Sequence, residues 1–289
     1  MKHIKYIFQF IIILFLFFIF KIIGYKNASN LGSKIGEFFG KIIKSDKIIK
    51  KNLDVINKDV ESKIYNYDKI TDKVFSNYGR ILSEYMYLHK FRDGTLNKYI
   101  KINGIENLEE IKSKKKKVVF ISGHFNNFEL MAMFIDSYGI DLAAIYRPLN
   151  NIYLNKVMES LRSNYICKNQ IKKGKAGVRE IINFLKKNFS IALMIDQRVT
   201  EGIALNFFGE TAFTTTIPAQ IVKKFDCEIV PVHIERYNKF NFNLSFHRPI
   251  KFKSSSSIEE ITSELNKILE KMILKDPSQW ILTHNRWKN

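Results

Sequence analysis

The chain has 289 residues, and because 46% of them are hydrophobic it can bury a full core as one domain or two. Its formal net charge of +19 suits anionic partners, which include lipid headgroups, phosphorylated substrates, an acidic carrier protein and nucleic acid. Two cysteines, Cys167 and Cys227, form no C-x-x-C pair, which argues against a metal or disulfide framework and fits core thiols in a reducing compartment.

The first feature along the chain is an apolar segment at residues 4–23, interrupted by Lys5, Gln9 and Lys21. At about 1.5 Å per residue it just reaches across a hydrocarbon core of about 30 Å. A signal peptide has a similar pattern, but the residues that follow contain no good A-x-A-like cleavage site and carry lysines where small residues are needed. We therefore expect residues 1–24 to be an uncleaved membrane anchor and residues 25–289 to form the main domain. More lysines follow the segment than precede it, which predicts a cytoplasmic main domain.

Helical patterns fill the next region, from Ser29 to about Phe91. The first helix has an apolar face beside a lysine-rich face, and it is compatible with either a membrane-surface helix or a core-facing helix. Its apolar residues are Leu31, Ile35, Phe38, Phe39 and Ile42. A second long helix is predicted from Asp68 to His89, with an aromatic stripe that we interpret as core.

The central motif begins with an apolar run, Val118–Ser122, which predicts a buried strand of an α/β sheet. Helical spacing then starts, and a helix is predicted from about Asn126 or Asn127. His124 would lie in the turn between them, and Glu129 in the first turns of the helix, close enough to orient the imidazole. This pair is typical of a catalytic base with its orienting acid. The H-x4-E spacing is also common by chance, so a structural loop histidine beside a surface glutamate is the alternative.

Two further strands are predicted to end in polar residues. Residues 142–148 form a strand that ends at Arg147, whose planar fork suits a phosphate. Residues 190–196 form a strand that ends in Asp196, followed by Gln197 and Arg198. If these strands are parallel to the central one, their ends meet His124 at one edge of the sheet.

The remaining elements complete an α/β fold with a mixed, largely parallel sheet flanked by helices and an N-terminal anchor helix. Between the strands, helices are expected at 150–162 and after the cation-rich entry at 172–179, which contains Arg179. A helix ending near Lys224, strands at 228–235, 240–246 and 249–252, and a final helix at 258–275 follow. No Walker or dinucleotide-binding fingerprint is present.

Taken together, these landmarks resemble the lipid A biosynthesis late acyltransferases, the lauroyl and myristoyl transferase family of the lysophospholipid acyltransferase-like superfamily. The resemblance covers nearly the whole chain and rests on the order of several short motifs. They are the N-terminal anchor, the sequence Gly-His-Phe-Asn-Asn-Phe-Glu at 123–129, Tyr-Arg-Pro at 146–148, Asp-Gln at 196–197, Phe-Phe-Gly at 207–209, and Pro-x-Gln-Trp at 277–280 with His284, Arg286 and Trp287. Arg198 and Leu282 depart from the usual family pattern, which leaves the acceptor and the acyl chain length open.

The resemblance implies O-acyl transfer without a cofactor or a metal at the bacterial inner membrane. His124 would act as base and Glu129 would orient it, while a thioester of acyl carrier protein, or acyl-CoA, would donate the acyl chain to a phosphorylated glycolipid. Arg147, Arg179 and Arg198 are the expected phosphate ligands, and Asn126, Asn127, Asp196 and Gln197 the other substrate-binding residues.

Two alternatives stay open from the sequence. One keeps the fold but acylates another glycolipid or a phospholipid from acyl-CoA. The other is a membrane-tethered nucleic-acid-binding protein, suggested by charge alone. The basic residues are dispersed and match no nucleic-acid motif, so we expect no nucleic-acid partner.

Overall fold

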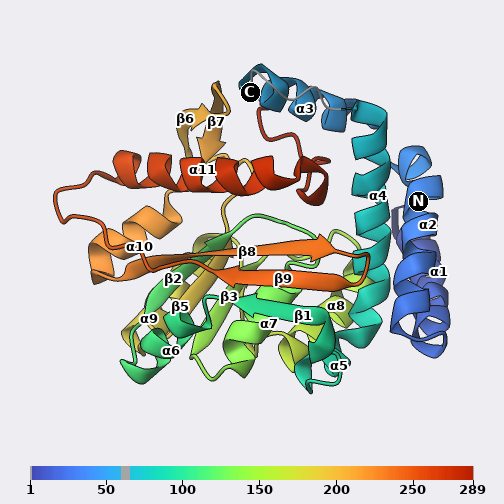
Figure 1. The fold of residues 1–289 in the computed structure, drawn as a ribbon, viewed down its shortest axis with the longest axis horizontal. Helices are drawn as coiled ribbons and strands as arrows, with labels where there is room; N and C mark the ends of the chain where they lie inside the picture. Colours follow the sequence, from blue (N-terminus) through green and yellow to red (C-terminus); the bar gives the residue numbers. More distant parts are fainter. Residues whose placement is uncertain (1, 60–65, 289) are drawn as a thin grey trace.

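A seven-stranded sheet forms the centre of the computed structural model, which describes residues 2–59 and 66–288 (Figure 1). The strand order is β1-β9-β8-β2-β5-β3-β4. Strands β8, β2, β5, β3 and β4 are parallel to one another, β9 is antiparallel to β8, and β1 is parallel to β9. Their bounds are β1 Ile100–Asn103, β2 Val118–Ser122, β3 Leu142–Tyr146, β4 Asn169–Lys172, β5 Ser190–Met194, β8 Glu228–Tyr237 and β9 Asn241–Phe246. The expected mixed, largely parallel sheet is confirmed.

The apolar runs located the central strands correctly, and β2 is buried at every position. The strand expected at 249–252 is wrong, since only an isolated bridge joins Ile250 to Ile229. Short strands β1 and β4 were not anticipated, nor was a separate hairpin of β6 (Ile203–Phe207) and β7 (Glu210–Thr214).

Helices cover both sides of this sheet. Helix α11 lies on one side of β8 and β9 and helix α7 on the other, while α4 stands at the edge with α1 and α2 outside it (Figure 1). A capping box between Ser257 and Glu260 begins α11, which has the predicted bounds. The helices are α1 Lys2–Ile22, α2 Tyr25–Ile43, α3 Lys47–Asp59, α4 Tyr67–Glu84, α5 Leu88–Arg92, α6 Ile105–Ser113, α7 Glu129–Ser137, α8 Ile152–Tyr165, α9 Lys175–Lys186, α10 Ile217–Phe225 and α11 Ile258–Lys275.

Helix α1 is the one helix in the described part of the chain that is long and apolar enough to cross a membrane, by length and composition. Most of its side chains are exposed, but Phe17 and Phe20 belong to the protein core. The hydroxyl of Tyr87 also donates a hydrogen bond to the carbonyl oxygen of Phe20. The carboxyl half of the expected anchor therefore packs against the rest of the protein.

Helices α2 and α4 approach each other at backbone contact distance, and glycines make this possible. A Cβ atom added to Gly79 would lie 1.8 Å from the carbonyl oxygen of Gly32, and one added to Gly36 would lie 2.0 Å from that of Phe75. No side chain fits at these positions, so the two backbones are in direct contact.

We expect Gly79→Ala to reduce the free energy of unfolding by about 1–3 kcal/mol, because its methyl group would push α2 away from α4. Lys73→Ala, at an exposed position of the same helix, is the matched control and should change stability by less than about 0.5 kcal/mol. Thermal unfolding of both purified variants measures the effect. Equal melting temperatures would show that α2 can move aside without cost.

Candidate functional site

His124 lies in the turn at the carboxyl end of β2, next to the end of β5, where Asp196 follows. The Nδ1 atom of His124 is 2.7 Å from the Oδ1 atom of Asp196, and the backbone N–H of His124 donates to Oδ2 at 2.8 Å. The expectation that the ends of these strands meet is confirmed for this pair.

The Asp196 carboxylate is fully buried and has a third donor, the indole N–H of Trp280 at 2.8 Å. Burial raises the pKa of Asp196, but the interaction with His124 and the hydrogen bonds from His124 and Trp280 outweigh it and hold that pKa below its usual value. An ionised carboxylate accepts the Nδ1 proton of His124, which leaves Nε2 as the basic nitrogen. Asp196 was expected to bind substrate, but a fully buried side chain beneath the imidazole has no surface for that contact.

Glu129 does not hold His124, contrary to the expectation from the H-x4-E spacing. Its Oε1 atom accepts hydrogen bonds from Nε of Arg162 at 2.8 Å and from the hydroxyl of Tyr85. Helix α7 begins at Glu129 itself, later than predicted, and this carboxylate pairs with the arginine of α8. The position expected for Glu129 is occupied by Asp196, which comes from the neighbouring strand.

Asn126 and Asn127 support the turn from inside the protein and are 2% and 1% exposed. Asn126 has a positive φ of 38°, and its side chain is hydrogen-bonded to Gln279 and Arg236. The side-chain amide of Asn127 donates to Glu84 at 3.0 Å. Both were expected to bind substrate, and the structure instead gives them buried structural contacts.

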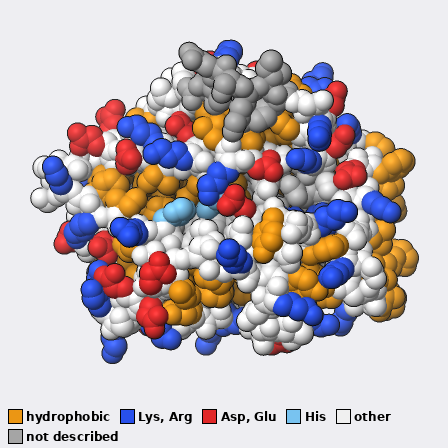
Figure 2. Space-filling view, viewed as in Figure 1, with side chains coloured by type: hydrophobic (Ala, Val, Ile, Leu, Met, Phe, Trp, Pro, Cys, Tyr) orange, Lys and Arg blue, Asp and Glu red, His pale blue; other side chains and the backbone are white. Residues whose placement is uncertain are grey.

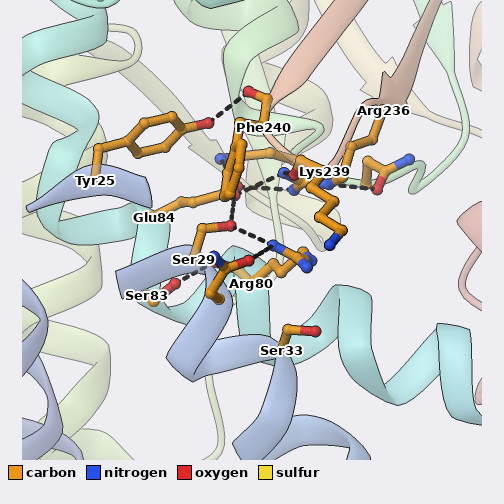
Figure 3. A network of polar contacts seen from close by, with 12 residues as sticks. Tyr25, Ser29, Ser33, Arg80, Ser83, Glu84, Arg236, Lys239 and Phe240 are labelled. Carbon is orange, nitrogen blue, oxygen red and sulfur yellow. Dashed lines mark hydrogen bonds and ion pairs between the residues drawn. The ribbon is translucent and has the colours of Figure 1, made fainter. Parts of the chain in front are cut away.

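A buried ion pair between Glu84 of α4 and Arg236 of β8 supports this turn through Asn126 and Asn127. Figure 3 shows Glu84 and Arg236. Glu84 is fully buried and accepts from both terminal nitrogens of Arg236, at 2.7 and 2.9 Å. Ser29 of α2 donates to the same carboxylate at 2.9 Å and accepts from Arg80 at 3.0 Å. Because Asn127 shares Glu84, the network connects α2 and α4 with the His124 turn. These residues lie far apart in the sequence. The one sequence signal for the network was Glu84, a charged residue among the apolar positions of the helix predicted from Asp68 to His89.

A cavity of about 450 Å³ lies on one side of His124, within the range of ligand pockets. Its walls are mostly apolar and include Phe120, Met131, Ala132, Ile135, Ile145 and Ile166. Exposed residues Arg147, Leu149 and Asn150 also line it, so it opens to the surface beside them.

Only some of the predicted substrate ligands line this cavity. Arg147 and Gln197 line it together with His124, whereas Arg179 and Arg198 are absent from its lining. Arg179 is exposed on α9, and the side chain of Arg198 donates to the carbonyl oxygen of Lys288 at 2.6 Å. Lys173, which was not predicted as a ligand, lines the cavity with Arg147.

A second imidazole, that of His284, lines the same cavity and was not predicted as a site residue. Burial lowers the pKa of His284 to about 4, so its ring is neutral near pH 7. The Nε2 atom accepts the backbone N–H of Arg198 at 3.1 Å, which leaves the proton on Nδ1 as a hydrogen-bond donor.

A smaller cavity of about 190 Å³ lies against α4, and His124 lines it as well. Its walls are again largely apolar, with Tyr78, Ile81, Tyr85 and Trp280 among them. His124 is therefore placed where two cavities meet. A base in this position can reach two different molecules at once.

A family model and two relatives found by sequence indicate the same family of proteins. The family model described as bacterial lipid A biosynthesis acyltransferase matches residues 1–289. A lipid A biosynthesis palmitoleoyltransferase of Escherichia coli strain K12 is 24% identical over 262 residues, covering 89% of this chain and 84% of that protein. A lipid A biosynthesis acyltransferase of Haemophilus influenzae is 24% identical over 203 residues, covering 68% and 63%. The crystal structure of a 1-acyl-sn-glycerophosphate acyltransferase from Thermotoga maritima has a TM-score of 0.44 at 16% identity, covering 89% of this chain and 99% of that one.

Proposed function

The chain belongs to the bacterial lipid A biosynthesis acyltransferase family, and from that premise we propose that it transfers a fatty acyl chain from an acyl carrier protein thioester to a hydroxyl of a lipid A precursor. The observation that carries the proposal is the imidazole of His124, held by buried Asp196 at the junction of two cavities. A transferase needs such a base between its donor and its acceptor.

In the proposed reaction, Nε2 of His124 takes the proton of the acceptor hydroxyl while that oxygen attacks the thioester carbonyl. The tetrahedral intermediate then collapses, the carbon–sulfur bond breaks, and the imidazolium returns its proton to the leaving thiolate. Asp196 keeps Nδ1 protonated throughout and stabilises the imidazolium, as the acid of a serine hydrolase triad does.

The hydroxyl of Ser122 beside the site and the two thiols of the chain, which line neither cavity, favour this direct transfer over an acyl-enzyme intermediate. Ser122 is 4% exposed, and its hydroxyl donates to the carbonyl oxygen of Gly123 at 3.3 Å. Burial raises the pKa of Cys167 to about 12 and that of Cys227 to about 11, so neither thiol is ionised near pH 7. The attacking oxygen is therefore supplied by the acceptor.

The walls of the larger cavity suit both the acyl chain of the proposed donor and the phosphate of the proposed acceptor. Its apolar interior accommodates the hydrocarbon of the acyl chain. At its open side, Arg147 and Lys173 offer two cationic groups to a phosphate of the glycolipid. Burial and the nearby charge of Arg147 lower the pKa of Lys173, a repulsion that a bound dianion would relieve. The basic surface also suits an acidic carrier protein and the cytoplasmic face of an anionic membrane.

Mass spectrometry of the lipid products tests the proposal directly. Purified protein is incubated with a lipid A precursor and either an acyl carrier protein thioester or the matching acyl-CoA. We expect a product heavier by one acyl group, formed faster from the carrier protein thioester. Acylation of lysophospholipids alone would contradict the acceptor assignment, and equal rates with acyl-CoA would contradict the donor.

We expect Arg147→Lys to raise the KM for a phosphorylated acceptor about tenfold while kcat and the KM for the donor stay nearly unchanged. Lysine keeps the charge but loses the two-point geometry of the guanidinium. A tenfold rise in KM corresponds to a loss of about 1.4 kcal/mol of binding free energy that is the same in the ground state and the transition state. Kinetics on phosphorylated and dephosphorylated acceptors measure it.

The matched control is Arg179→Lys, at an exposed position outside the cavity lining, which should behave as the wild type. An equal loss by Arg147→Lys on both acceptors would remove Arg147 from phosphate binding.

A further inference from the structure

Helix α1 has two distinct faces along its whole length. Exposed apolar side chains recur every three or four residues on the outer face, at Ile4, Phe8, Ile11, Phe15, Phe18 and Ile22. The inner face is directed at the protein and carries Tyr6, Phe10, Ile13, Phe17 and Phe20, which are all half-buried or buried. A helix that spans a bilayer with its domain on one side is surrounded by lipid, whereas α1 leaves only one face for lipid.

The inner face is attached to the folded body near both ends of the helix. At the amino end, the side-chain amide of Asn151 donates to the carbonyl oxygen of Tyr6 at 2.9 Å, and the ring of Phe10 contacts the first turn of α8. At the carboxyl end, Phe20 is 1% exposed and its carbonyl oxygen accepts from Tyr87. From Tyr6 to Phe20 the helix axis advances about 21 Å, most of a hydrocarbon core of about 30 Å.

These contacts conflict with a spanning orientation. If α1 crossed the bilayer, the start of α8 would be drawn into the hydrocarbon together with Asn150 and Lys156, which are both exposed. Polar and charged groups that face lipid in the membrane interior are strongly disfavoured.

We propose that α1 lies in the plane of the membrane, with its outer face in one leaflet, and does not cross to the other side. The neighbouring surface extends this apolar face, with exposed Leu149 and Ile152 beside the amino end of α1 and Phe38, Phe39, Ile42 and Ile43 on α2. Figure 2 shows hydrophobic side chains gathered at the edge where Figure 1 places α1 and α2. The same two helices carry the exposed lysines Lys5, Lys21, Lys26 and Lys34. Their charge favours a leaflet with anionic headgroups.

This orientation gives the lipid substrate a direct route to His124. Leu149 belongs both to the apolar surface and to the lining of the larger cavity. The opening beside Arg147 therefore borders the leaflet, and an acceptor lipid can enter sideways without leaving the membrane. This route rests on the proposed function, whereas the orientation of α1 does not.

Sided labelling of single cysteines tests the orientation in the full-length protein. His3→Cys places a thiol near the start of α1, and Lys253→Cys places one on an exposed loop of the catalytic body. The natural Cys167 and Cys227 are buried, so the wild type gives the background. Sealed, uniformly oriented membrane vesicles from expressing cells are treated with an impermeant maleimide, before and after detergent. We expect both positions to be labelled to the same fraction from the same side, and labelling from opposite sides would overturn the proposal.

Depth measurements separate a flat helix from a steeply tilted one. A fluorophore is attached in turn to Ile4→Cys, Ile11→Cys and Ile22→Cys, which all lie on the outer face. The vesicles contain lipids that carry a nitroxide at a shallow or a deep position. The flat orientation predicts that all three positions are quenched best by the shallow nitroxide, to within about twofold of one another. Preferential deep quenching at Ile11 would overturn it, whatever the enzymatic activity of the variants.

Discussion

Replacing His124 with alanine should lower the turnover of acyl transfer by a factor of about 10²–10⁴, the usual contribution of a general base. The loss arises because no other described side chain holds a basic nitrogen between the two cavities with a carboxylate behind it. Asp196 keeps the hydrogen bonds from Trp280 and from the backbone N–H of residue 124, so the fold should survive. Product formation by the purified variant, in membranes or detergent, measures the effect.

His247→Ala is the control for loss of an imidazole, since His247 is exposed and lines neither cavity. It should retain the turnover of the wild type. Turnover of His124→Ala within a factor of two of the control would remove His124 from the chemistry.

Asp196→Asn should impair turnover nearly as much as the loss of His124, with a decrease of at least about 10²-fold. An asparagine has almost the same size but no charge, so it neither selects the Nδ1 tautomer nor stabilises the imidazolium. The KM for either substrate should change little, because the side chain is fully buried and acts through His124.

Glu129→Gln is the matched comparison. It should lower stability and largely retain turnover, whereas Asp196→Asn should lower turnover. Glu129 pairs with Arg162, whose side chain is 11% exposed, so the substitution leaves a buried guanidinium without its charge partner. We expect a loss of roughly 3 kcal/mol in the free energy of unfolding, with turnover of the folded fraction largely retained. If Glu129→Gln instead abolished turnover at unchanged stability while Asp196→Asn stayed active, Glu129 would be the orienting acid.

The contrast between Glu129 and Asp196 also shows what the sequence could predict. Apolar runs located β2, β3 and β5, and the polar residues that follow them identified the edge of the sheet where the site lies. Which carboxylate reaches the imidazole depends on strand order. Strand β5 lies beside β2 although 67 residues separate Ser122 from Ser190, and no local pattern encodes that neighbour.

The direction in which side chains point was the second property that the sequence did not predict. Asn126 and Asn127 adjoin His124 in the sequence, and proximity suggested that they bind substrate. The positive φ at Asn126 turns the chain there, and both side chains point into the buried network instead. The four-residue strands β1 and β4 were missed because so short a run has no distinguishable period.

The glycine contact between α2 and α4 has a mechanical consequence. Where a backbone carbonyl occupies the place of a side chain, the two helices cannot roll or slide past each other without separating completely. The two helices therefore move as one rigid unit, with Phe38 and Phe39 at one end and Glu84 at the other. Because Glu84 also accepts a hydrogen bond from Asn127 in the turn that carries His124, this helix pair holds the imidazole at a fixed position relative to Phe38 and Phe39.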